Sequence, residues 1–225
     1  MRRKNAKYLR CDSQIEKKMN FKYYDVISSL VVGYVLLVIT MYSFHIEYNS
    51  DYTVAYLAFA FVLGYVINSV GSLLEPIYFF TIGGKPSTRL LNEGKEDHCW
   101  LYNLFVPKNT GIKKVCFYET ANVRKILIEG LKDEHPSEDR LFCKAMREVN
   151  GEQNSRVQDF NAHYALSRTI LTTILISTIL VIVSHPCCWQ SYLSIIVLLI
   201  CWNRYKERAY YYAREVLNEY LRKNK

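Results

Sequence analysis

The segment of this sequence that most resembles a catalytic or ligand-binding motif is glycine-rich, GGKPST at residues 83–88. Its order invites comparison with a phosphate-binding loop. However, Phe79 occupies the place of the first glycine of that motif, and a proline follows Lys85. A phosphate loop also needs a strand before it and a helix after it, and no such context is evident. We therefore expect a tight turn here and no phosphate site.

Histidines and cysteines do not show the spacing of a metal centre. The chain has neither a C-x-x-C nor an H-x-x-x-H pair, and His98, Cys99 and the other cysteines are scattered. Zinc sites usually draw on such closely spaced ligands. We expect no metal, no cofactor and reduced structural thiols. Cys187 and Cys188 differ because the orientation argued below places them on the oxidising, non-cytoplasmic side of a membrane. There they either link two subunits or pack beside lipid, and both alternatives remain open.

The polar residues do not predict a catalytic site either. No serine or cysteine can be placed beside His135 or His163 as a nucleophile with its base. Neighbouring acids such as Glu138 and Asp139 are typical of a solvent-facing surface. The sequence therefore predicts that the chain is not an enzyme.

A different group of polar residues lies inside otherwise apolar runs. These residues are uncharged, and the candidates are Asn68, Ser69, Ser72, Thr172, Thr173 and Ser177. Small and hydroxyl side chains let membrane helices approach closely and hydrogen-bond, each contact contributing about 0.6–2 kcal/mol. Helix packing is one interpretation, and lining of an aqueous path after oligomerisation is the other. The lack of ionisable residues at mid-depth argues against a proton-coupled or charge-selective transporter.

The runs that carry these residues are long enough to cross a membrane. Residues 26–44 and 52–74 contain no charge, and neither do residues 169–203. A span needs about 20 apolar residues, so each of the first two runs fits one helix. The third run contains Pro186 and predicts two shorter helices joined by a turn at residues 184–190. The fold class expected is an all-α membrane protein with four transmembrane helices.

Basic residues predict the orientation of these spans. Residues 1–25 hold eight Lys and Arg, residues 75–168 hold 14, and residues 203–225 hold seven, which accounts for all 29. The short loop at residues 44–51 contains only acidic charges, and the turn at 184–190 contains none. By the positive-inside rule, both termini and the middle segment are cytoplasmic. The formal net charge of +8 then needs no nucleic acid to explain it, and direct nucleic-acid binding is not predicted.

The segments outside the membrane are predicted to be mainly helical. Residues 1–25 form a basic tail, and residues 75–168 form a helical insertion that begins with loops and short elements. Helices are expected near residues 112–132, from Pro136 to Val149, and from about Glu152 into the third span. An amphipathic helix at residues 204–225 carries an apolar stripe. It either packs with the helix before span three as a stalk, or lies flat on the bilayer.

This layout resembles the small multi-pass membrane effectors of bacterial anti-phage systems, of the retron-associated or Kiwa type. The resemblance rests on the basic start MRRKNAKYLR, the short external loops, the middle module and the tail RYKERAYYYAREVLNEYLRKNK. It implies an inner-membrane effector that permeabilises the membrane in abortive infection when its module is triggered. Expected partners are the lipid bilayer, further copies of the chain, and a cytoplasmic protein or nucleic-acid complex encoded nearby. The alternative is a membrane-anchored sensor or scaffold that recruits a cytoplasmic partner.

Overall fold

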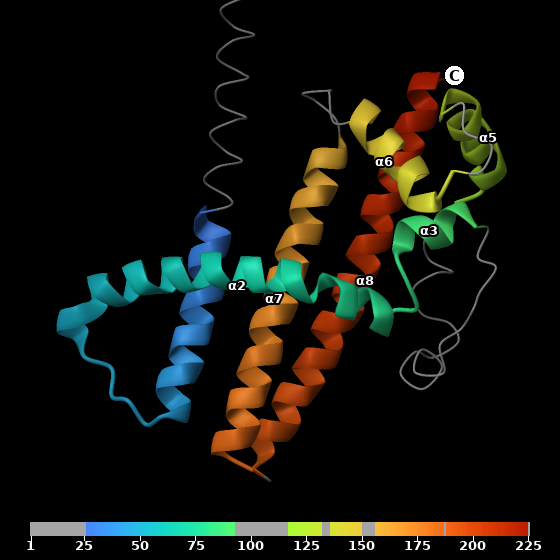
Figure 1. Ribbon diagram of the computed structural model, residues 1–225. Coiled ribbons are helices and arrows are strands. Elements are labelled where there is room, and N and C mark those ends of the chain that lie inside the picture. Colours follow the sequence, from blue (N-terminus) through green and yellow to red (C-terminus); the bar gives the residue numbers. More distant parts are fainter. Residues whose placement is uncertain (1–25, 93–116, 132–135, 150–155, 187, 225) are drawn as a thin grey trace, which may run out of the picture. The chain divides into compact units, whose positions relative to one another are not determined.

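A computed structural model describes residues 26–92, 117–131, 136–149, 156–186 and 188–224. Every regular element in these ranges is a helix (Figure 1). The basic tail, His98, Cys99, His135, Cys187 and the start of the helix expected at 112–132 lie outside the described residues. The chain divides into two compact units, each treated by itself below. Unit 1 comprises Met1–Val70 and Thr172–Ile195, and unit 2 comprises Gly71–Leu171 and Ile196–Lys225.

Three of the helices are long and apolar enough to cross a membrane. They are the helix Val26–Ser43, the stretch Ser50–Thr81 that contains η1 (Ser50–Tyr52) and α2 (Thr53–Thr81), and α7 (Arg156–Ser184). The predictions of an all-helical chain and of membrane-spanning helices are thus confirmed at this level. The fourth predicted span falls in α8 (Trp189–Asn224), which is not among the three, so a fourth crossing stays a prediction.

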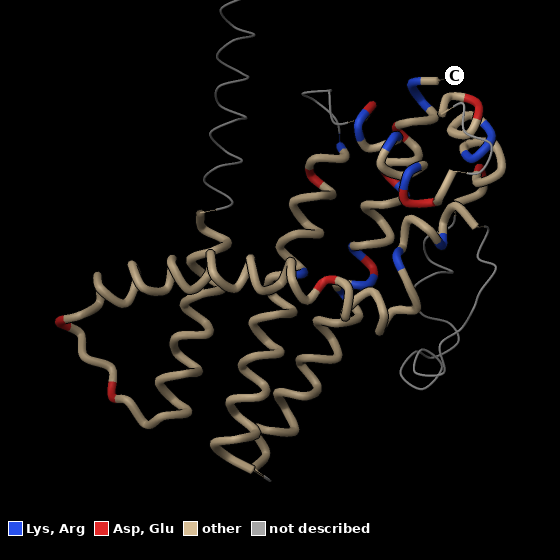
Figure 2. Tube along the Cα trace, in the orientation of Figure 1, with Lys and Arg blue, Asp and Glu red and all other residues tan. Residues whose placement is uncertain are grey.

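Unit 1 is built on a very close helix crossing. A methyl group placed on Gly33 would lie 1.8 Å from the carbonyl oxygen of Ala60 on α2, and one on Gly64 would lie 1.9 Å from that of Ser29. Only glycine lets the two backbones approach so closely, as is usual where membrane helices pack. Beside this crossing lie two small apolar clusters, one of which includes Ile67 of α2. Among the described residues of this unit, the charged ones are Glu47 and Asp51, in the connection before α2 and in η1, and its long helices carry none (Figure 2).

Within unit 2, α2 continues further than the sequence suggested. The sequence predicts loops and short elements from residue 75 onwards, but α2 runs through Pro76 to Thr81, so this part of the prediction is wrong. A proline removes one helical hydrogen bond, yet Tyr78 and Ile82 beyond it are 5% and 0% exposed. Burial of these apolar side chains offsets the loss. Tertiary packing here outweighs the local preference.

The glycine-rich segment that follows α2 is a tight turn, as predicted. Gly83 and Gly84 have φ of 83° and 113°, values that favour glycine. The N–H of Gly84 donates to the carbonyl of Phe79 at 2.8 Å, which closes the end of α2. Pro86 then occupies the first turn of α3 (Pro86–Leu91), where its missing N–H costs nothing.

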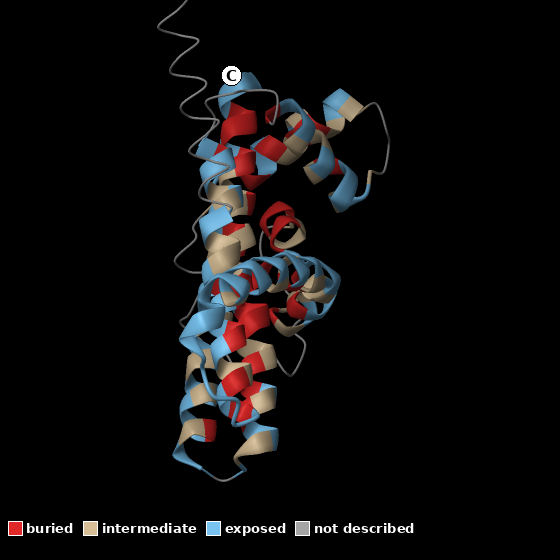
Figure 3. Cartoon of the chain, turned by 90° about the vertical axis from the view of Figure 1, so that its left-hand side faces the viewer, coloured by how far each residue is buried: buried red, intermediate tan, exposed pale blue. Residues whose placement is uncertain are grey.

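The rest of unit 2 is a helical module with its own hydrophobic core (Figure 3). The module consists of α3, α5 (Thr120–Leu131), α6 (Glu138–Val149) and the later turns of α8. Its completely buried side chains include Val123, Leu127, Leu141 and Leu217. The predicted helix from Pro136 to Val149 is confirmed as α6, and α5 lies inside the range expected for the helix before it.

The helix expected from Glu152 into the third span is confirmed as α7, and α8 extends without a break to Asn224. Arg156 of α7 pairs with Glu215 of α8 at 3.7 Å, a contact that a stalk of these two helices allows. Four residues of the C-terminal stripe are buried in unit 2, namely Tyr205, Ala209, Val216 and Tyr220. Protein side chains therefore cover this stripe, as the stalk interpretation requires and the flat-lying alternative does not.

Candidate functional site

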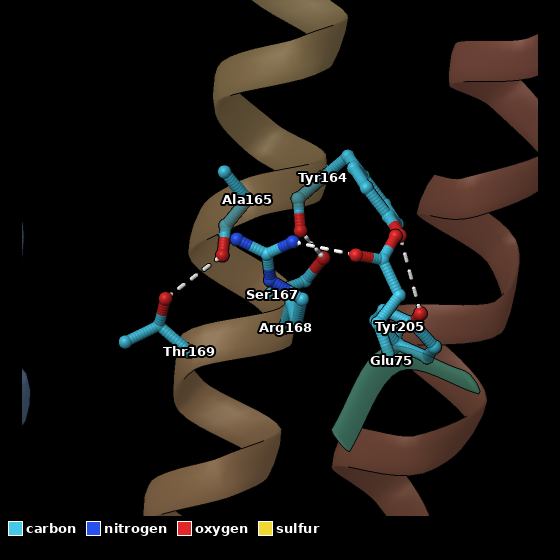
Figure 4. Close-up of polar contacts among 7 residues, drawn as sticks. All are labelled: Glu75, Tyr164, Ala165, Ser167, Arg168, Thr169 and Tyr205. Atoms are coloured by element: carbon cyan, nitrogen blue, oxygen red, sulfur yellow. Dashed lines mark hydrogen bonds and ion pairs between the residues drawn. The ribbon is translucent and has the colours of Figure 1, made fainter. Parts of the chain in front are cut away.

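The two charged residues that border the apolar runs form an ion pair in unit 2. Glu75 on α2 is the first charged residue after residues 52–74, and Arg168 on α7 is the last one before residues 169–203. Nη1 of Arg168 donates to Oε2 of Glu75 at 2.9 Å. Their side chains are only 13% and 26% exposed, for Arg168 and Glu75 respectively. This pair, drawn in Figure 4, is less exposed than the surface pair of Arg204 and Glu207, whose side chains are 53% and 25% exposed.

Two tyrosines complete the site around the same carboxylate. The hydroxyl of Tyr164 on α7 donates to Oε1 of Glu75, so both carboxylate oxygens are hydrogen-bonded. The hydroxyl of Tyr205 on α8 lies 3.3 Å from that of Tyr164. Hydrogen bonds to an ionised acceptor are stronger than neutral ones. The carboxylate therefore joins α2 to α7, and the contact between the two tyrosines extends the network to α8. We call these four residues the Glu75 cluster.

Aromatic rings surround the Glu75 cluster. The ring of Tyr212 stacks on Tyr164 at a centroid distance of 5.7 Å and an angle of 8°, and Tyr78 meets Tyr205 edge-on at 5.5 Å. Burial raises the pKa of Tyr212 above the usual tyrosine value, and the nearby Glu75 carboxylate raises it further. A raised pKa keeps the phenol neutral, so only the ion pair carries charge here.

Further bonds tie the end of α2 and the helix after it to α8. Nε1 of Trp202 donates to Oγ1 of Thr81 at 2.8 Å. Nη1 of Arg89 on α3 donates to the carbonyl of Ile82 at 3.2 Å and to the hydroxyl of Tyr210 at 3.1 Å. The Glu75 cluster is thus one of several polar contacts that fix these segments within unit 2.

No protein-family model matches the chain. Searches of curated proteins and of solved structures find no match either. Within the described residues, no group of three or more His, Cys, Asp or Glu side chains is arranged to hold a metal ion. The geometry of the site is that of a partly buried, hydrogen-bonded ion pair between helices.

The six polar residues singled out from the sequence have different environments. Thr172, Thr173 and Ser177 of α7 are 0%, 2% and 4% exposed, so they are buried within a single copy of the chain. Asn68 on α2 is half-buried, whereas Ser69 and Ser72 are exposed. The hydroxyl of Ser69 donates to the carbonyl of Tyr65 in the preceding turn. The three buried residues have the placement that a packing role requires.

Sequence reasoning missed the Glu75 cluster. It placed Glu75 and Arg168 only as the first and last residues of the helical insertion at residues 75–168, with no contact between them. The available signal was their position, because opposite charges border two of the apolar runs. The two tyrosines carried no such signal, since the chain has 19 of them.

Proposed function

We propose that this chain is a multi-pass protein of the bacterial inner membrane, with both termini and the helical module in the cytoplasm. In this proposal it is a non-enzymatic effector of anti-phage defence, which permeabilises the membrane when its module is triggered. The three apolar helices, and the lack of charge in residues 26–44, 52–70 and 172–195 of unit 1, support a membrane location. The observation that carries the proposal is the Glu75 cluster, because α2 and α7 each continue from it into unit 1.

The cluster suits a latch for two physical reasons. Removing one partner of a buried ion pair leaves an uncompensated charge, so the closed arrangement is strongly preferred while both partners are present. Its members come from three helices, so any rearrangement of α2 against α7 and α8 in unit 2 must break the bonds to Glu75. A cytoplasmic partner bound to the module would bias this equilibrium only through a difference in affinity for the two states.

The test compares expression of the wild type with Glu75→Gln, which keeps the shape of the side chain but removes its charge. We expect wild-type expression without its partners to depolarise cells, measured with a potential-sensitive dye, and Glu75→Gln to depolarise them at lower protein levels. Glu207→Gln is the matched control, because the Arg204–Glu207 pair is more exposed and joins residues of one helix. Full viability and normal polarisation with both the wild type and Glu75→Gln at high expression would contradict the effector proposal.

The second candidate function is a membrane-anchored sensor or scaffold that recruits a cytoplasmic partner. Burial of Thr172, Thr173 and Ser177 favours it, since these hydroxyls face protein and not a water-filled path. Asn68→Leu separates the two functions. If oligomers line a pore with Asn68, this variant lowers toxicity more than it lowers membrane abundance. Equal losses of both would assign Asn68 to packing.

A further inference from the structure

Two histidines far apart in sequence meet in unit 1. His45 follows the helix Val26–Ser43, and His185 lies in the turn between α7 and α8. Their ring centroids are 5.6 Å apart with an interplanar angle of 85°. The ring of Tyr42 lies 5.2 Å from that of His185, and its hydroxyl accepts a bond from Nε2 of Gln190 at 3.4 Å. This contact joins the two hairpin connections of unit 1.

Two polar atoms at this contact are available to donate an electron pair to a ligand. Nε2 of His185 and Oε1 of Gln190 are both buried and make no hydrogen bond with the described residues. Buried polar atoms are rarely left in this state unless they serve a role. The backbone of His45 has φ of 55° because it forms the left-handed cap of the helix Val26–Ser43, in which the N–H of Ile46 donates to the carbonyl of Met41 at 2.9 Å. This cap fixes the position of His45 beside the turn that holds His185.

We propose that His45 and His185 bind one Zn²⁺ ion or a similar late divalent transition-metal ion. Imidazole suits these metals, and a Zn–N bond of about 2.0–2.1 Å at tetrahedral angles places two ligand rings roughly 5.2 Å apart. The observed 5.6 Å is close to this separation. The torsion of a histidine ring is soft, so the exposed His45 can turn its nitrogen toward the ion. Oε1 of Gln190 and water complete the coordination.

This inference goes beyond the proposed function and does not depend on it. A site with two histidines binds metal less tightly than a closed site of four protein ligands. Its consequence is mechanical, because the ion links the connection after the helix Val26–Ser43 to the turn between α7 and α8. An ion that binds only the folded state also stabilises it.

The test is calorimetric titration of the full-length chain in detergent with ZnCl₂. We expect one ion per chain. His45→Asn and His185→Gln should each lower the zinc affinity at least about tenfold, because mutation of a residue that only supports a metal ligand already lowers metal affinity about 10–100-fold. Asparagine is chosen at position 45 because it tolerates the left-handed backbone. His163→Gln is the matched control, an exposed histidine on α7. Cys188→Ser tests whether a thiol supplies the binding, and we expect no change in either control.

Two measurements keep the test decisive if a variant folds poorly. Zinc should raise the thermal midpoint of the wild type, but not that of His45→Asn with a normal metal-free midpoint. Electron paramagnetic resonance of the wild type with Cu²⁺ should show two coordinating imidazole nitrogens. Unchanged zinc affinity in both histidine variants, loss of binding in Cys188→Ser, or a copper spectrum with fewer than two imidazole nitrogens would overturn the proposal.

Discussion

Unit 1 packs its helices through glycines and small apolar clusters, whereas unit 2 packs through leucines, tyrosines and ion pairs. In unit 1 the backbones themselves touch at Gly33 and Gly64. In unit 2 a core of buried residues, within the ranges that the structure describes, joins α3, α5, α6, α7 and α8. Many large apolar side chains of unit 1 remain exposed, among them Val54 at 80% and Val183 at 75%.

This difference is the one expected if the solvent around unit 1 is lipid and the solvent around the module of unit 2 is water. In lipid, burying an apolar side chain against protein gains little, so helices associate through close van der Waals contact and hydrogen bonds. In water, apolar burial supplies most of the stability. Among the described residues, the salt bridges lie in unit 2, and the ion pair of the Glu75 cluster is one of them. The packing of each unit is therefore the packing that our proposal requires, with unit 1 in lipid and the module in water.

The largest expected effect concerns the glycines. Gly33→Ala puts a methyl group against the backbone of Ala60, which cannot move aside as a side chain can. We expect a loss of about 3 kcal/mol, at the upper end for overpacking. Gly130→Ala on α5 meets only the flexible end of Lys144, and a gain of up to about 1 kcal/mol is expected from helix propensity. Unfolding of the purified chain by denaturing detergent measures both. Similar effects for the two variants would remove the distinction between the units.

The next effect concerns the ion pair of unit 2. Glu75→Gln leaves the Arg168 charge without its partner, and we expect a loss of about 2 kcal/mol, less than for a completely buried pair because both side chains retain some exposure. Glu207→Gln should cost below about 0.5 kcal/mol, as for an exposed pair. The double variant Glu75→Gln with Arg168→Gln should recover part of the loss. Equal costs for Glu75→Gln and Glu207→Gln would show that the Glu75 cluster is no latch.

The smallest effect is a pH dependence confined to the tyrosines of unit 2. Burial raises the pKa of Tyr212 above the unfolded value of about 10. The stability from its neutral, buried phenol is therefore complete below pH 10 and is lost as pH rises toward the folded pKa. Tyr212→Phe should flatten the fall of the thermal midpoint as the pH rises above about 10. Tyr118→Phe, at a residue 90% exposed, should leave the slope unchanged. A slope that Tyr212→Phe does not alter would contradict this.

The sequence predicted the helices better than their contacts. Charge-free runs and a 3.6-residue period locate α6, α7 and the stripe of α8, because both signals come from residues close in the chain. The loop predicted after residue 74 is wrong, because burial of the residues beyond Pro76 outweighs the tendency of proline to end a helix. The Glu75 cluster, and likewise the contact between His45 and His185, could not be found. Each joins residues from different helices or turns, and no local pattern specifies which of several tyrosines or histidines will meet.

The central claim of the proposal concerns orientation in the membrane. The helical module faces the cytoplasm, and the turn between α7 and α8 faces the opposite side of the membrane. Cys143 on α6 and Cys188 in that turn are both exposed and suit a direct test. Two variants would be prepared, each with one of these two residues as its single cysteine. Intact cells that express them would be treated with a thiol reagent that cannot cross the membrane. The account predicts labelling of Cys188 in intact cells and of Cys143 only after permeabilisation. Labelling of Cys143 in intact cells with protection of Cys188 would contradict it.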